Sequence, residues 1–137
     1  RVTSSFVEGA SNFSFNSLTF CGHPSMSTKY ASPALGRYEP DLDTALHDAD
    51  VVMTLRIQYE RFEETLELDL DEYKEAYQLT SEKLDQAKGD AIVMHPGPVN
   101  YVEISESVYQ SEQSVIRNQI ANGVAIRMAV LSRFLSR

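Results

Sequence analysis

The sequence has one cysteine, no tryptophan and no long apolar run. A lone Cys21 excludes an internal disulfide, and with three histidines in 137 residues it supplies no closed metal site. Without disulfides, the default compartment is the reducing cytoplasm. No run approaches the roughly 20 apolar residues that a membrane-spanning helix needs, so we expect no membrane partner.

Positive charge is also scarce, with 12 Lys and Arg against 20 Asp and Glu. Nucleic acids bind to basic surfaces, so we expect no nucleic-acid partner for a chain with a net charge of −8. No glycine-rich phosphate loop is present, which disfavours a nucleotide-binding domain. The length fits a single domain, and the first residue, Arg1, indicates a piece of a longer protein.

Apolar runs alternate with helical patterns along the chain. A short β-branched and aromatic run at 18–21 predicts a strand, as do the runs 51–55 and 91–94. The last two lack alternation, which is typical of strands buried on both faces. Helical patterns cover residues 1–16, 41–48, 80–87 and 111–134. This order predicts an α/β fold with an open, mainly parallel sheet and flanking helices.

Two other segments have distinct compositions. The acidic stretch 60–75 is typical of a solvated loop, and the Ser- and Pro-rich stretch 25–36 also predicts a loop. In contrast, the end of the chain at 120–135 is apolar nearly all round its predicted helix. Such a helix is buried on more than one side, which implies a missing partner surface.

Polar residues that could bind a ligand follow the predicted strand at 51–55. In open α/β sheets, ligands bind beyond the carboxyl ends of the strands. Arg56 and Gln58 point the same way in an extended chain, and the guanidinium fork of Arg56 suits a carboxylate. Glu60 could hold Arg56 in place. The alternative is an ordinary surface ion pair between Arg56 and Glu60.

A second candidate segment, His95-Pro96-Gly97-Pro98, follows the predicted strand at 91–94. Two prolines fix the backbone on either side of a glycine, which leaves peptide carbonyls open to close approach. Such a loop can bind an ammonium group or a small polar ligand. The alternative is a plain tight turn with a capping histidine.

Together, three motifs resemble the catalytic chains of aspartate carbamoyltransferases. They are Arg-x-Gln-x-Glu-Arg at 56–61, His-Pro-x-Pro at 95–98 and the helical segment 122–131. The similarity extends over residues 49–135 and is looser before residue 49. Ornithine carbamoyltransferases typically carry His-Cys-Leu-Pro where this chain has His95-Pro-Gly-Pro98, which makes them the weaker match.

The resemblance implies that residues 1–137 are the aspartate-binding domain of a two-domain chain. This family joins a carbamoyl group from carbamoyl phosphate to L-aspartate in pyrimidine biosynthesis, in the cytoplasm, as a homotrimer and without cofactor or metal. The helix 120–135 would pack on the missing carbamoyl-phosphate domain, without which the sheet is incomplete and the chain inactive.

The resemblance also implies roles for particular residues. Arg1, Arg56 and Gln58 would grip the carboxylates of aspartate, and the carbonyls of Pro96 and Gly97 would bind the amine and the carbamoyl nitrogen. The supporting residues would be Glu60, Arg61 and His95, with Glu60 orienting Arg56 and Arg61 pairing across the domain gap. The acidic 63–75 segment would close over the substrate.

Two segments depart from the family pattern. Asn100 is followed by Tyr101-Val102-Glu103-Ile104, which is one residue shorter than usual and lacks an Arg-Gly pair, and residues 3–6 lack an arginine. These changes leave a second hypothesis open, that of a non-catalytic scaffold or interaction domain descended from the same family.

Overall fold

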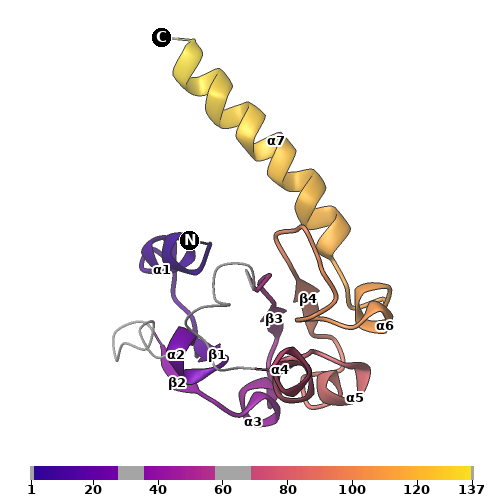
Figure 1. Ribbon diagram of the computed structural model, residues 1–137. Coiled ribbons are helices and arrows are strands. Elements are labelled where there is room, and N and C mark those ends of the chain that lie inside the picture. Colours follow the sequence, from indigo (N-terminus) through magenta and orange to yellow (C-terminus); the bar gives the residue numbers. More distant parts are fainter. Residues whose placement is uncertain (1, 28–35, 58–68, 137) are drawn as a thin grey trace.

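The computed structural model describes residues 2–27, 36–57 and 69–136. The helices are α1 (Val2–Ala10), α2 (Pro24–Ser27), α3 (Leu42–Leu46), α4 (Leu70–Tyr77), α5 (Ser81–Leu84), α6 (Glu106–Tyr109) and α7 (Ile116–Leu135). The strands are β1 (Thr19–Cys21), β2 (Arg37–Glu39), β3 (Val51–Met53) and β4 (Ile92–Met94). In Figure 1, α7 extends as a long rod away from the shorter elements gathered at its foot.

The strands pair in parallel, which confirms the predicted α/β class. β1 pairs with β2, with Thr19 opposite Arg37. β3 pairs with β4, with Val51 opposite Ile92. Among the described residues these are two separate two-stranded sheets, and helices flank the short parallel strands.

β4 is held on both of its edges. β3 lies on one side, and on the other the Val93 N–H donates to Gln113 O at 2.8 Å while Val93 O accepts from Val115 N at 3.0 Å. Val93 is completely buried. The strand that leads into His95 is therefore fixed before the loop begins.

One apolar core joins the sheet β3–β4 to the surrounding helices. Its buried members are Leu46, Leu79, Leu84, Val93, Ile104, Val108 and Ile116. The short helices around it have capping side chains, which satisfy N–H groups that a single turn cannot satisfy. Thr80 Oγ1 accepts from Lys83 N at the start of α5, and Ser105 Oγ accepts from Val108 N at the start of α6.

The prediction of a loop throughout 60–75 was wrong for residues 70–75, which lie in α4. Asp69 Oδ1 accepts from Asp71 N, and acidic residues in the first turn suit the positive end of the helix dipole. Tyr73 is buried and packs on Tyr77, with ring centroids 5.0 Å apart. Because acidic residues dominate this stretch, its composition did not indicate an amphipathic helix. Residues 58–68 lie outside the described residues.

Other predicted boundaries shift where backbone turns intervene. The predicted helix 1–16 ends at Ala10, where Asn12 N–H donates to Gly9 O. The predicted helix 111–134 begins at Ile116, because the backbone groups of Gln113 and Val115 pair with Val93 as an isolated parallel β-bridge. Neither β2 nor α6 was predicted, and the prediction of a loop at 25–36 was wrong for residues 25–27, which lie in α2.

The expectation that 51–55 and 91–94 are buried on both faces was wrong in part. Val51 is 52% exposed and Ile92 is 37% exposed. An apolar run shows which residues avoid water, but it does not show whether this chain supplies a cover for both faces.

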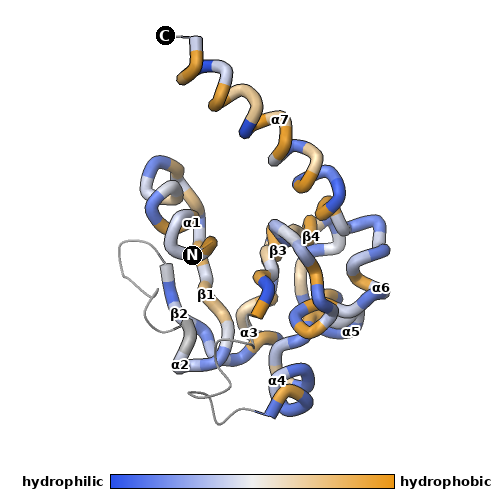
Figure 2. The backbone as a smooth tube through the Cα atoms, turned by 45° about the horizontal axis from the view of Figure 1, so that its top comes forward, coloured by the Kyte–Doolittle hydropathy of each residue, from blue (hydrophilic) through white to orange (hydrophobic). Residues whose placement is uncertain are grey.

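Helix α7 is apolar and largely uncovered. Its buried residue is Ile116, whereas its other large apolar side chains are 44–79% exposed. These are Ile120, Val124, Ile126, Met128, Val130, Leu131, Phe134 and Leu135. Figure 2 shows apolar segments recurring along the whole rod. In the described part of the chain, α7 and the other helices are too short or too polar to span a bilayer.

Candidate functional site

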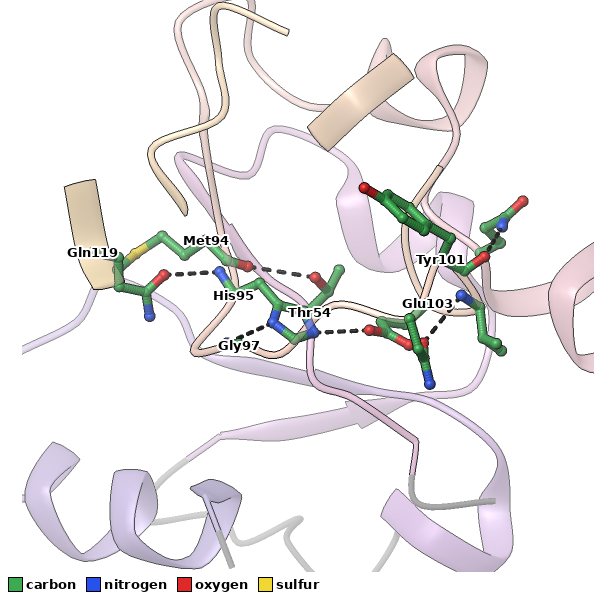
Figure 3. A network of polar contacts seen from close by, with 10 residues as sticks. Thr54, Met94, His95, Gly97, Tyr101, Glu103 and Gln119 are labelled. Carbon is green, nitrogen blue, oxygen red and sulfur yellow. Dashed lines mark hydrogen bonds and ion pairs between the residues drawn. The ribbon is translucent and has the colours of Figure 1, made fainter. Parts of the chain in front are cut away.

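The two segments that follow β3 and β4 lie at the same edge of the sheet. Thr54 N–H donates to Met94 O at 3.0 Å, and Thr54 Oγ1 donates to the same oxygen at 3.4 Å, so the chain leaves both strands side by side (Figure 3). Arg56 follows two residues after Thr54, and His95 follows directly after Met94. The parallel pairing thus brings together the two candidate segments, as expected for the carboxyl ends of neighbouring parallel strands. The Arg56 side chain is exposed there.

His95 is completely buried and is held at three atoms. Its backbone N–H donates to Gln119 Oε1 at 2.8 Å. Its ring Nδ1 lies 2.8 Å from Gly97 N, and its ring Nε2 lies 2.8 Å from Glu103 Oε1 (Figure 3). The histidine therefore links the start of the loop, the segment after it and the first turn of α7.

The contacts of His95 fix its tautomer. Because the Gly97 N–H can only donate, Nδ1 must accept and carries no proton. The ring proton is then on Nε2, where it donates to the Glu103 carboxylate. Both ring nitrogens are used within the chain, so His95 holds the loop and does not face a ligand.

The same contact sets the direction of a peptide carbonyl. The Pro96–Gly97 peptide is trans, and in a trans unit the N–H and C=O point in opposite directions. With the Gly97 N–H directed at the buried imidazole, the Pro96 carbonyl points away from it. Among the described residues, no donor contacts the Pro96 or Gly97 carbonyl. Both residues are half-buried, and Gly97 has φ +73°.

Glu103 is a member of the site that the sequence reasoning did not select. It is 3% exposed, and its Oε2 has no hydrogen-bond partner among the described residues. Its backbone is fixed, because Glu103 O accepts from Leu79 N at 3.0 Å. A carboxylate between Val102 and Ile104 is the signal that could have identified it, since a buried charge needs a partner.

Tyr73 of α4 lies close enough to Glu103 to sense its charge. Burial first, and then the Glu103 carboxylate, raise the pKa of the Tyr73 phenol, which therefore stays neutral. Helix α4 thus places a buried, uncharged side chain near the carboxylate.

Four of the predicted site residues lie outside the described residues: Arg1, Gln58, Glu60 and Arg61. The part of the acidic segment up to residue 68 lies outside them as well. Within the described ranges, no three His, Cys, Asp or Glu side chains gather as a metal site would require.

Comparison with known proteins identifies the family. Residues 1–134 match the model of the aspartate/ornithine carbamoyltransferase Asp/Orn binding domain. The aspartate carbamoyltransferase catalytic subunit of Coxiella burnetii is 42% identical over 139 residues, which cover 100% of this chain and 44% of that protein. The Xanthomonas oryzae pv. oryzae catalytic subunit is 50% identical over 96 residues, 69% of this chain and 30% of that protein. The chain thus spans less than half the length of these curated relatives.

Solved structures agree with this result. Aspartate transcarbamoylase from Trypanosoma cruzi, in complex with carbamoyl phosphate, superposes with a TM-score of 0.69 at 25% identity, over 82% of this chain and 38% of that one. Ornithine carbamoyltransferase from Pyrococcus furiosus superposes with a TM-score of 0.60 at 27% identity, over 76% and 34%. The parallel strands, the loop at their shared edge and the match over nearly every residue lead to one conclusion: this chain belongs to the aspartate/ornithine carbamoyltransferase family and corresponds to its Asp/Orn binding domain.

Proposed function

We propose that this chain is the aspartate-binding part of an aspartate carbamoyltransferase. The observation that supports it best is the convergence at one sheet edge of Arg56 and the open carbonyls of Pro96 and Gly97. Aspartate presents a complementary set of groups, two carboxylates and one amine. A guanidinium binds a carboxylate through charge-assisted hydrogen bonds, and carbonyls accept from an amine.

The reaction would form a bond between the aspartate nitrogen and the carbamoyl carbon. The bond from that carbon to the phosphate oxygen would break, and phosphate would leave with the bonding electrons. The proton that the amine loses would pass to the departing phosphate. The attacking amine must be a free base, so neutral carbonyl acceptors suit it better than a carboxylate, which would favour the ammonium form. Carbamoyl phosphate is already activated, so positioning and charge stabilisation suffice and no cofactor or metal is needed.

The remaining contacts are proposed from the family resemblance. Arg1 and Gln58 would complete the grip on the two carboxylates, Glu60 would orient Arg56, and Arg61 would pair across the gap between domains. A second domain would hold carbamoyl phosphate, the ligand present in the Trypanosoma cruzi enzyme. Residues 120–135 of α7 would pack on that domain, and their exposure in this chain supports the assignment.

The assembled protein would be a cytoplasmic homotrimer that supplies pyrimidine biosynthesis, and the isolated chain would be inactive. Ornithine as the substrate is less favoured, because Arg56 would repel its side-chain ammonium. A non-catalytic scaffold is also less favoured, since the shortened 101–104 segment still places Glu103 on His95.

A chimeric protein tests the proposal. Residues 1–137 are fused behind the part of the Coxiella burnetii catalytic subunit that this chain does not match. Formation of carbamoyl aspartate from carbamoyl phosphate and L-aspartate is expected, with no product from L-ornithine. A folded chimera that binds carbamoyl phosphate but neither turns over aspartate nor binds succinate would refute the proposal in favour of a scaffold.

A further inference from the structure

The buried pair of His95 and Glu103 lies in a core that is otherwise apolar. Its neighbours in the sequence and in the core include Val93, Ile104 and Val108, all completely buried. Removing two polar side chains from water is costly, and apolar replacements of similar volume often leave stability unchanged or improve it. Stability alone therefore does not explain the pair, whereas an orienting role would.

The pair acts on the loop through one ring. Glu103 Oε1 accepts from Nε2, which leaves Nδ1 as the acceptor for the Gly97 N–H at 2.8 Å. Without the carboxylate, the ring could place its proton on Nδ1, and Nδ1 would then repel the Gly97 N–H. The Pro96–Gly97 peptide would lose the contact that fixes its plane, and with it the direction of the Pro96 carbonyl.

The first turn of α7 supplies a second anchor. Gln119 Oε1 accepts from His95 N at 2.8 Å, and Ile120 packs over Gly97. Figure 3 shows Gln119 and Glu103 on opposite sides of His95. The loop is thus held from the helix on one side and from the 101–105 segment on the other.

We propose that Glu103 and Gln119 are positioning residues for the aspartate amine, with Glu103 acting through the His95 ring and Gln119 through the His95 backbone. This inference rests on the proposed function and adds two residues to it. The imidazole separates the Glu103 charge from the carbonyl that meets the amine. The carboxylate therefore orients the acceptor without stabilising the unreactive ammonium form.

The test compares Glu103→Leu and Glu103→Gln in the chimera, with Glu106→Gln on the exposed side of α6 as the matched control. Glu103→Leu removes the acceptor for Nε2 and is expected to raise KM for aspartate about tenfold, a loss typical of one charged hydrogen bond. KM for carbamoyl phosphate should change less than about twofold, because the loop meets only the carbamoyl nitrogen of that substrate, whereas its charged phosphate would be held by the other domain. Glu103→Gln keeps an acceptor oxygen and should restore most of the affinity, and Glu106→Gln should match the parent.

Two further measurements separate a change in the orientation of the loop from a loss of folding. Nitrogen-15 spectra of labelled histidine should show His95 as the Nε2–H tautomer in the parent and a changed ring in Glu103→Leu. If Glu103→Leu does not fold, Gln119→Leu, which lies at a half-buried position, should still raise KM for aspartate selectively. An unchanged aspartate KM in a folded variant, or equal rises for both substrates, would overturn the inference. A parent chimera that binds no succinate would instead refute the proposed function itself.

Discussion

Ile120 Cδ1 lies 3.4 Å from the point where a Cβ on Gly97 would stand. Gly97 also has a positive φ of +73°, which L side chains rarely adopt. Gly97→Ala is therefore expected to cost about 1–2 kcal/mol in unfolding free energy from the backbone alone, measured by urea denaturation. Gly89→Ala is the matched control, because beyond the neighbouring residues no atom lies within 4 Å of where a Cβ would stand, and it should be neutral or slightly stabilising. If Gly97→Ala and Gly89→Ala changed the unfolding free energy equally, the close packing of the loop against α7 would be contradicted.

Arg56 should dominate binding of a dicarboxylate. Arg56→Ala removes a charge-assisted contact worth about 1.5–3 kcal/mol, so succinate affinity in the chimera should fall about 10- to 100-fold in calorimetry. Arg37→Ala changes another exposed arginine, on β2, and should leave affinity unchanged. If Arg56→Ala binds succinate as the parent does, Arg56 is not part of the site.

Truncation to alanine should change the unfolding free energy far more at a buried position of α7 than at an exposed one. Ile116 is completely buried, so Ile116→Ala should destabilise the chain by about 2–5 kcal/mol. Met128 is 65% exposed, and Met128→Ala should change the unfolding free energy by less than about 0.5 kcal/mol. Thermal or urea unfolding of the two variants compares them directly. A large loss for Met128→Ala would mean that the rod is covered in solution.

The thiol of Cys21 should be unreactive at neutral pH. Burial first, and then the charge of Glu39, raise its pKa to about 11. Alkylation by iodoacetamide should be slow at pH 8 in the folded chain and fast in urea, because the thiolate is the nucleophile.

The raised pKa of Cys21 also makes the stability of the folded chain depend on pH. The folded pKa lies above the unfolded value of about 8.5, so this contribution is fully present below pH 8.5 and is lost as the pH rises towards 11. Replacing Cys21 with Ala should remove that part of the alkaline loss in a series of melts. A thiol that reacts equally fast in the folded and unfolded chain would contradict its burial.

The exposed apolar rod should make the isolated chain associate. Contiguous apolar patches of several hundred Å² usually drive association, so light scattering after size exclusion should report species above 15.4 kDa. Ile126→Glu with Leu131→Glu should reduce that association, because both side chains are more than half exposed. A monodisperse monomer with a cooperative melt in the parent chain would favour the scaffold hypothesis.

Local signals predicted the elements that depend on local interactions. The helical pattern at 80–87 predicted α5, and the apolar runs at 51–55 and 91–94 predicted β3 and β4. The parallel-sheet rule then predicted that Arg56 and the 95–98 loop share an edge. What could not be predicted depends on distant partners. Helix α4 is stabilised by the burial of Tyr73, and Glu103 meets His95 only through a turn with Tyr101 at φ +57°. The carboxylate between two apolar residues indicates a buried charge, but local composition does not show which distant residue Glu103 or Tyr73 meets.

The attachment of α7 at its first turn makes the helix a lever with its pivot at the loop. Twenty residues at 1.5 Å each give an arm of about 30 Å, so a tilt of about 5° moves the far end by about 2.6 Å. Gln119, three residues from the start of the helix, would move by only about 0.4 Å. The outer end of the rod can therefore adapt to whatever it packs on, while the hydrogen bond at His95 stays within its normal length.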